Sequence, residues 1–193
     1  MTLELLVVPC KPAESGRPCK PAESGRPSQS MTASQADDVV ALCGEIFQCD
    51  YRSLLDLCPV RTHVLGYAHG RLVSHALWLD RPLRVNWGPW RNTAYVEGVA
   101  THGDYRNRGY GAAVMRRLQE EIASYDFAAL SPAVEAWYLS LGWERWLGPL
   151  YIEEECSVMP TPDECVLIYR TPKTGELNLK ASLTAPWRPF ELW

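Results

Sequence analysis

The hexapeptide Arg106-Asn107-Arg108-Gly109-Tyr110-Gly111 has the residue types needed to bind a phosphate group. It lies between a stretch typical of a strand, 93–101, and a stretch typical of a helix, 111–124. Glycines let a ligand approach the backbone closely, and the first N–H groups of a helix have no intrahelical partners. Together with the helix dipole and two arginines, such a junction attracts an anion. The sequence therefore predicts a pyrophosphate cradle, and the alternative is a tight structural turn with surface arginines.

The spacing of the glycines argues against the two best-known phosphate-binding motifs. The segment does not match G-x-x-x-x-G-K-[ST], which argues against a P-loop nucleotide hydrolase. It does not match G-x-G-x-x-G either, which argues against a dinucleotide-binding βαβ unit. Because short motifs match by chance, the surrounding elements must decide whether this junction is functional.

The elements around the junction alternate between strands and helices. Apolar residues recur at helical spacing between Val39 and Phe47, after a capping pattern that starts at Ser34. A polar loop or a second short helix follows and ends at Pro59. The predicted helices are 34–47, 111–124 and 131–142, and the predicted strands are 62–69, 71–79, 93–101, 127–130 and 165–169. This order predicts one α+β (α/β) domain around a single central sheet.

The N-terminal region differs from the rest of the chain in composition. The nine-residue sequence PCKPAESGR occurs at 9–17 and again, without change, at 18–26. Two polar copies rich in Pro, Gly and Ser are too few to build a repeat fold and bury little apolar surface. We therefore expect residues 1–30 to be a disordered tail and residues 31–193 to be the domain. Met31 is an alternative start of the chain.

The overall composition is that of an ordinary globular protein. The chain has 193 residues, of which 47% are hydrophobic and 22% charged, and a formal net charge of −4. The mild negative charge argues against a nucleic-acid partner, and no run approaches the roughly 20 apolar residues of a membrane span. Metal-ligand spacing is not found among the seven cysteines or among His63, His69, His75 and His102. We expect a cytoplasmic protein with free thiols, no metal and no membrane partner.

Two segments, in this order, resemble the motifs of the GNAT superfamily of N-acetyltransferases. The R-x-x-G-x-G match at 106–111 resembles the acetyl-CoA motif, and 136–143 (AWYLSLGW) resembles the second motif. Within the superfamily, the stretch 95–100 (YVEGVA) and the tail with Trp187-Arg188 and Trp193 are similar to the aminoglycoside 2'-N-acetyltransferases. The resemblance covers about residues 34–193. It implies the GNAT acyl-CoA N-acyltransferase fold, a mixed and mostly antiparallel central sheet flanked by helices, and a homodimer.

The same resemblance implies that acetyl-CoA is the acetyl donor. In the family, the pyrophosphate binds the backbone N–H groups of the glycine turn, and the pantetheine arm runs beside the preceding strand. Carried over to this sequence, the residues that contact the cofactor are Val99, Thr101, Arg106, Arg108, Gly109, Gly111 and Ala112. Ser131 either contacts the pantetheine or caps the helix that Pro132 begins and Gly142 ends.

Direct acetyl transfer in a ternary complex needs a deprotonated amine, a polarised thioester carbonyl and a proton for the leaving thiolate. Glu97 is the predicted base, acting through water; alternatively it anchors a cationic substrate electrostatically. Tyr138 is the predicted general acid; alternatively it is a packed tyrosine that offers only a hydrogen bond. The backbone N–H of Val99 is expected to polarise the carbonyl, provided that a bulge directs it there.

The resemblance implies that the substrate is an aminoglycoside antibiotic, acetylated at its 2'-amine. Such a small-molecule cationic amine favours a site lined by carboxylates. Beside Glu97, the expected contacts are Asp50, Glu191 and the terminal carboxylate of Trp193, and the further acidic candidates are Asp56, Asp163 and Glu164. Glu191 and Pro186 stand where the aminoglycoside enzymes carry Asp, a departure that affects substrate range more than reaction type. The alternatives are a GNAT enzyme for another small amine, a polyamine or a protein amine, and a non-catalytic CoA-binding or drug-sequestering module.

Overall fold

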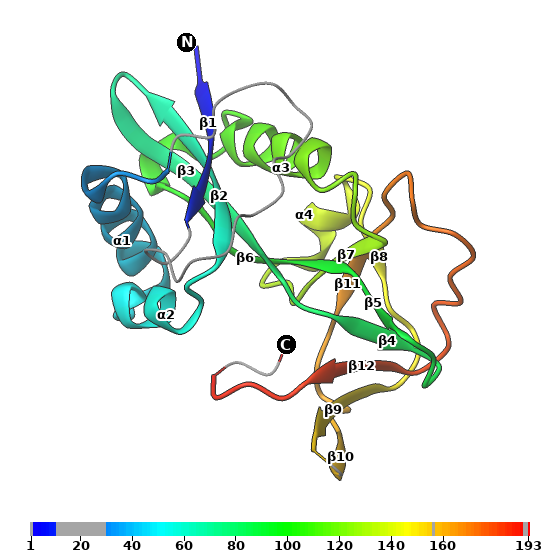
Figure 1. Ribbon diagram of the computed structural model, residues 1–193. Coiled ribbons are helices and arrows are strands. Elements are labelled where there is room, and N and C mark those ends of the chain that lie inside the picture. Colours follow the sequence, from blue (N-terminus) through cyan, green and yellow to red (C-terminus); the bar gives the residue numbers. More distant parts are fainter. Residues whose placement is uncertain (1, 11–29, 156, 191–192) are drawn as a thin grey trace. The chain divides into compact units, whose positions relative to one another are not determined.

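The computed structural model describes residues 2–10, 30–155, 157–190 and 193, and the chain divides into two compact units (Figure 1). Unit 1 consists of Met1–Leu79 and Gly98–Arg117, and unit 2 of Asp80–Glu97 and Leu118–Trp193. The strand β6 (Thr93–Thr101) begins in unit 2 and ends in unit 1. The helix α3 (Tyr110–Glu121) begins in unit 1 and ends in unit 2. The predicted strand 93–101 is confirmed.

Unit 1 is built on a sheet of neighbouring strands. They follow the order β1 (Glu4–Cys10), β2 (Arg61–Ala68), β3 (Arg71–Asp80) and the second half of β6. β1 pairs with β2, and β2 with β3, in antiparallel register. His69 and Gly70, both with positive φ, form the tight turn between β2 and β3 that the sequence predicts. Each of these two strands lies within one residue of its predicted limits.

The strand β1 shows that the prediction of a disordered tail over residues 1–30 is wrong for its first part. All of Glu4–Cys10 pairs with β2. The cause is its apolar content, because Val8 is buried and Leu6 packs against the same hydrophobic core as the helices. The ordered domain therefore includes residues before position 31. Residues 11–29 of the predicted tail, with most of the tandem repeat, lie outside the described residues.

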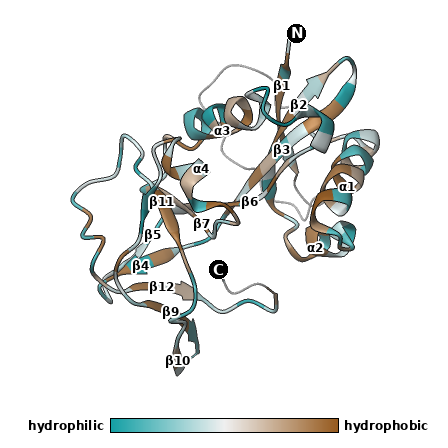
Figure 2. Ribbon diagram, turned by 180° about the vertical axis from the view of Figure 1, so that it is seen from behind, coloured by the Kyte–Doolittle hydropathy of each residue, from teal (hydrophilic) through white to brown (hydrophobic). Residues whose placement is uncertain are grey.

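The helices of unit 1 cover both faces of its sheet (Figures 1 and 2). α1 (Ala33–Phe47) and α2 (Tyr51–Leu57) place their apolar side chains on the core that β2 and β3 share with them. The first turns of α3 lie on the opposite face, where Tyr110 packs with Ala68 and Val73. α1 starts earlier than predicted, because Thr32 and Gln35 form a reciprocal capping box ahead of Ser34.

Unit 2 contains the remaining strands of the predicted central sheet and, in addition, a second sheet that the sequence did not predict. In the first, the order is the first half of β6, then β7 (Phe127–Leu130), β11 (Leu167–Tyr169) and β8 (Glu144–Arg145). Only β6 and β7 are parallel there. In the second, the order is β10 (Ser157–Pro160), β9 (Leu150–Glu154), β12 (Leu183–Pro186), β4 (Leu83–Val85) and β5 (Trp90–Arg91). These five strands are too short for a periodicity that reading the sequence could detect.

The helix α4 (Glu135–Leu139) of unit 2 is shorter than predicted. Val134 occupies its N-cap position and no side chain caps the first turn, so the interpretation of Ser131 as the helix cap is wrong. Gly142 adopts a φ of 87° after the helix, as expected of a residue that follows a helix end. No helix in the described parts of the chain has the length and apolar character needed to cross a lipid bilayer.

Gly98 interrupts the regular path of β6 in unit 1. Its φ is 59°, in the left-handed region where side chains are strained. A Cβ atom at this position would lie 2.0 Å from the hydroxyl oxygen of Tyr51, which is far too close for any real contact. Only glycine tolerates both the positive φ and the close approach of Tyr51. The glycine at position 98 therefore explains the irregularity between Glu97 and Val99.

We expect Gly98→Ala to lower the free energy of unfolding by roughly 2–4 kcal/mol, through left-handed strain and overlap with Tyr51. In a Tyr51→Phe background the overlap should shrink and the strain remain, so part of the loss should be recovered. Gly44→Ala is the matched control, because Gly44 lies inside α1 and the added Cβ would be 3.4 Å from the carbonyl oxygen of Cys49. It should stabilise by about 0.5–1 kcal/mol. Urea unfolding measures all four proteins, and an unaffected Gly98→Ala would contradict the assignment.

Candidate functional site

The predicted phosphate cradle lies in unit 1, where the chain passes from β6 into α3. A single 3₁₀ turn, Gly103–Tyr105, is followed by four residues before α3 begins at Tyr110. Asn107 and Gly109 have positive φ values of 59° and 79°, and turns of this kind present backbone N–H groups to an anion. A Cβ atom added at Gly109 would meet nothing within 4 Å, so the space in front of the turn is open.

The two arginines of the cradle are exposed but held close to the turn. Arg106 Nε donates a hydrogen bond to the carbonyl oxygen of Thr101, at 3.3 Å. The guanidinium of Arg108 stacks over the ring of Tyr105, 5.2 Å from its centroid. An open glycine turn, a helix start and two guanidinium groups fit the diphosphate of CoA. Val99, Thr101, Gly111 and Ala112 belong to the same β6–α3 segment of unit 1.

Glu97 lies at the end of the β6 segment that belongs to unit 2, and its side chain is 24% exposed. Its Oε1 forms an ion pair with Arg188 of the C-terminal segment, whose side chain is only 10% exposed. The guanidinium of Arg188 also lies 5.3 Å from the ring centroid of Tyr95, which precedes Glu97 by two residues in β6. Reading the sequence did not assign Arg188 a contact at the site. The alternation of the strand places Tyr95 and Glu97 on one face, but it does not indicate Arg188 as their partner.

Tyr138 is buried in α4 of unit 2, between two tryptophans. Its ring meets Trp137 and Trp143 edge-on, at centroid distances of 4.8 and 6.2 Å. Burial raises the pKa of Tyr138 to about 12. The phenol therefore carries its proton throughout the neutral and moderately alkaline range, as a proton donor must.

The predicted substrate contacts are distributed over both units. Trp193 is buried in unit 2, and its indole N–H donates to Thr161 Oγ1 at 2.8 Å. Asp50 lies in unit 1 as the N-cap of α2, and hydrogen bonds from Ser53 lower the pKa of its carboxyl group. Asp50 thus has a structural role that the sequence prediction did not include. Glu191 lies outside the described residues.

Within unit 2, Glu97 and Trp193 each lie near an arginine that also lies over the ring of Tyr95. Tyr95 is flanked by Arg188 and by Arg81, whose guanidinium carbon lies 4.7 Å from the Tyr95 centroid and 5.9 Å from the ring of Trp193. Arg81 also donates a hydrogen bond to the carbonyl oxygen of Pro186, at 3.1 Å. The C-terminal segment is therefore held against β6 by two arginines.

Two buried histidines of unit 1 form a contact that reading the sequence did not anticipate. His63 Nδ1 lies 2.8 Å from His75 Nε2, and His75 Nδ1 lies 2.7 Å from the carbonyl oxygen of Gly98. Cys43 Sγ is 3.4 Å from His75 Nδ1, an arrangement that could be mistaken for a catalytic dyad. Burial raises the pKa of the Cys43 thiol to about 12, so it remains protonated and is not a nucleophile.

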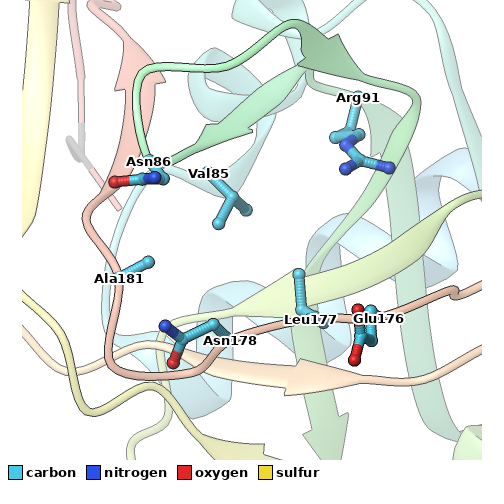
Figure 3. A pocket seen from close by; sticks show the side chains of 7 residues that line it. All are labelled: Val85, Asn86, Arg91, Glu176, Leu177, Asn178 and Ala181. Carbon is cyan, nitrogen blue, oxygen red and sulfur yellow. The ribbon is translucent and has the colours of Figure 1, made fainter.

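A separate hollow in unit 2 lies between the β4–β5 hairpin and the segment 176–181 (Figure 3). Its lining includes one cation and one carboxylate, Arg91 and Glu176, beside Val85, Asn86, Leu177, Asn178 and Ala181. None of the predicted site residues lines it. The chemistry predicted from the sequence therefore does not belong to this hollow.

The fold and the cradle agree with a comparison to known families. Residues 29–146 match the family model of the acetyltransferase (GNAT) domain. The chain therefore belongs to the GNAT acetyltransferases, which use acetyl-CoA to acetylate an amine. This confirms the α+β GNAT fold that the two motifs predict.

Individual relatives support the same assignment. An aminoglycoside 2'-N-acetyltransferase of Mycolicibacterium fortuitum is 35% identical over 142 residues, which cover 68% of this chain and 70% of that protein. The structure of YhbS, a GNAT family N-acetyltransferase of Escherichia coli solved in complex with CoA, has a TM-score of 0.58 at 13% identity, covering 96% of this chain and 91% of YhbS. A GCN5-related N-acetyltransferase from Kribbella flavida has a TM-score of 0.52 at 24% identity over 62% of this chain, which spans only 33% of that protein. Both structural similarities concern the fold.

The histidine pair predicts a loss of stability in acid. Burial, followed by the neighbouring His75 and Arg61, lowers the pKa of His63 to about 2. Burial lowers that of His75 to about 4, against the opposing effect of its bond to Gly98. In the unfolded chain both should titrate near about 6.5. Below that pH only the unfolded state takes up these protons, so the free energy of unfolding should fall by up to about 1.4 kcal/mol per pH unit for each histidine.

Urea unfolding at about pH 7.5 and about pH 5.5 measures this loss. His75→Asn should remove one histidine's share of the pH dependence. His69→Asn, in the exposed turn between β2 and β3, is the control for a histidine outside the buried pair and should keep the wild-type dependence. A stability that does not change between the two pH values would contradict the assignment.

Proposed function

We propose that this chain transfers the acetyl group of acetyl-CoA to the 2'-amine of aminoglycosides, directly, in a ternary complex. The observation that carries the proposal is the 35% identity, over 68% of the chain, to a protein named aminoglycoside 2'-N-acetyltransferase. The partly exposed carboxylate of Glu97 supports a cationic substrate. A cytoplasmic homodimer without nucleic-acid or membrane partners is part of the same proposal.

Acetyl-CoA supplies an activated acetyl group in the form of a thioester. The N–H groups at the turn 106–109 and at the start of α3, with Arg106 and Arg108, bind its diphosphate. In β6, Val99 and Thr101 bind the pantetheine arm through their backbone, and Ser131 at the end of β7 is a further contact. These assignments follow from the family motif and from the open space in front of Gly109.

Glu97 receives the proton that the amine must lose. Because Arg188 contacts Oε1, we assign Oε2 to the water or the ammonium group of the substrate. The amine nitrogen then forms the new bond to the carbonyl carbon and loses its second proton as the carbon–sulfur bond breaks. That proton replaces, through solvent, the one that Tyr138 gives to the sulfur. The ion pair with Arg188 fixes the orientation of the carboxylate, which a base acting through one water requires.

Two donors act on the other side of the reaction. The N–H of Val99 stabilises the negative charge that develops on the carbonyl oxygen. Tyr138 donates its hydroxyl proton to the departing sulfur, which yields a neutral thiol. The remaining ammonium groups of the substrate are assigned to Glu191, to the terminal carboxylate of Trp193 and to Asp50.

A pair of antibiotics that differ at one position tests the substrate. Kanamycin B carries an amine at 2', kanamycin A carries a hydroxyl there, and the two are otherwise identical. Thiol release from acetyl-CoA should occur with kanamycin B and stay at the background rate with kanamycin A. Equal rates would refute 2' specificity. Release with polyamines or peptide amines alone would favour an acetyltransferase for another amine, and CoA binding without release would favour a sequestering module.

Tyr138→Phe should lower kcat by about 10²-fold or more, because the thiolate loses its proton donor. Since the pKa of Tyr138 is about 12, the wild-type rate should not decline between about pH 8 and about pH 10 through loss of this acid. Tyr169→Phe is the matched control, since Tyr169 lies 5.6 Å from Trp143, in the same aromatic group, and has no assigned role. The rate of thiol release with kanamycin B measures catalysis, and calorimetric titration with CoA measures binding. Equal losses in both variants would exclude the acid role.

A further inference from the structure

A buried chain of polar groups in unit 1 ends on the irregular position of β6. Arg61 Nε lies 2.9 Å from His63 Nε2, His63 Nδ1 lies 2.8 Å from His75 Nε2, and His75 Nδ1 lies 2.7 Å from the carbonyl oxygen of Gly98. Both imidazoles are fully buried, with 0% of their surface exposed. Apolar residues would fill these positions at lower cost, because buried polar groups must be desolvated.

The groups at the two ends of this hydrogen-bond chain determine which ring nitrogens of the histidines carry protons. The carbonyl oxygen of Gly98 can only accept, so His75 must carry its proton on Nδ1. The Nε2 of a neutral His75 then accepts, so His63 must also carry its proton on Nδ1. That leaves His63 Nε2 as an acceptor, which matches the guanidinium of Arg61, a group that can only donate. The Nε–H of Arg61 and both ring N–H groups then meet an acceptor. The Cys43 thiol, 3.4 Å from His75 Nδ1, can donate to the Gly98 oxygen instead, at 4.0 Å.

The reverse arrangement fails at both ends. It would place the protons on the Nε2 atoms, so His63 would turn an N–H toward the N–H of Arg61. At the other end, a bare His75 Nδ1 would lie 2.7 Å from the lone pairs of the Gly98 oxygen. A proton added to either ring meets the same conflict, and Arg61 cannot take up a proton. The chain is therefore a fixed set of hydrogen bonds and not a path for proton transfer.

The last hydrogen bond of the chain controls the direction of a catalytic group. The carbonyl of Gly98 and the N–H of Val99 belong to one planar trans peptide, so they point in opposite directions. Fixing the Gly98 oxygen on His75 therefore fixes the direction of the Val99 N–H. A hydrogen bond to the oxygen also polarises the peptide and makes its N–H a stronger donor.

We propose that His63 and His75 are positioning residues for acetyl transfer, which hold the Gly98–Val99 peptide so that the Val99 N–H faces the reacting carbonyl. The inference rests on the proposed role of Val99 in the reaction. Arg61 orients the first histidine, and its Nη1 donates to the carbonyl oxygens of Leu55 and Cys58, at 2.7 and 2.5 Å, at the end of α2. The Tyr51 hydroxyl and the His75 ring both occupy the space that a side chain at Gly98 would need, so only glycine fits beside this hydrogen bond.

The proton positions are tested on the wild-type protein, without any substrate. Nitrogen-15 NMR of the full chain labelled at histidine should show His63 and His75 protonated at Nδ1 and not at Nε2, with no change between about pH 6 and about pH 8. A proton on Nε2 of His75, or titration of either ring in this range, would overturn the proposal. Because no acetyl acceptor is present, this result is independent of the substrate assignment.

Three substitutions of His75 test the effect on the reaction. His75→Leu removes the donor and should lower kcat by roughly 10–100-fold, with the KM for the amine and the Kd for CoA within about twofold of wild type. His75→Asn places an amide nitrogen near the position of Nδ1 and should recover most of the rate. His75→Gln places its amide near the position of Nε2 and should not. The Val99 amide proton should move upfield in the Leu and Gln variants only.

A structural role alone would give a different pattern. The loss of rate would then follow the loss of thermal stability, and the Asn and Gln variants would behave alike. Full kcat in a folded His75→Leu or His75→Gln protein would overturn the proposal and leave the proposed function intact. If kanamycin B is not acetylated, the same variants are assayed with the amine that the wild-type protein does acetylate, so failure of the substrate assignment is distinguished from failure of this one.

Discussion

The left-handed backbone at Gly98 is the constraint on which the geometry of the catalytic strand depends. In a regular strand, the side chains of Glu97 and Val99 would point to the same face, and the peptide groups of both residues would form hydrogen bonds with neighbouring strands. Because the φ of Gly98 is 59°, the peptide groups at this residue leave the direction that they would have in a regular strand. The hydroxyl of Tyr51 and the imidazole of His75 occupy the space beside it, so the turn cannot relax into a regular strand. The proposed donor for the reaction, the N–H of Val99, and the carbonyl that His75 holds thus belong to one peptide.

Sequence reasoning succeeded where the signal is local. The glycine turn at 106–111 could be predicted as an anion site from residue type alone, because glycine, arginine and a helix start each have a physical reason to meet an anion. The strands 127–130 and 93–101 were found because they are apolar and bounded by turn residues. The two-residue period of a strand is enough to predict that the side chains of Glu97 and Val99 lie on the same face. The family motif supplied what the residues could not, namely the identity of the anion.

The features that sequence reasoning missed all depend on contacts between distant residues. Glu97 and Arg188 are 91 positions apart, and nothing near either residue indicates that they form an ion pair. β1 was assigned to a tail because the repeat beside it dominates the composition, although Leu6 and Val8 carry enough apolar surface to join the core. His63 and His75 lie on paired strands as diagonal neighbours, since His63 pairs with Leu77 and His75 with Leu65. The sequence spacing of each histidine indicates neither a metal site nor a nucleophile. It therefore gives no sign that the two histidines contact each other across the strands.

The two neighbouring residues at the centre of this strand are held by different physical interactions. Glu97 is oriented by an ion pair to an arginine that stacks on Tyr95, an interaction that depends on charge and is weakened by salt where it reaches solvent. Gly98 is oriented by two neutral imidazoles that are themselves fully buried, so salt screens this interaction much less. In the proposed reaction the carboxylate of Glu97 meets a cationic substrate, for which it has to remain charged and partly exposed. A peptide that must only point in one direction gains most from an interior that neither water nor protons enter.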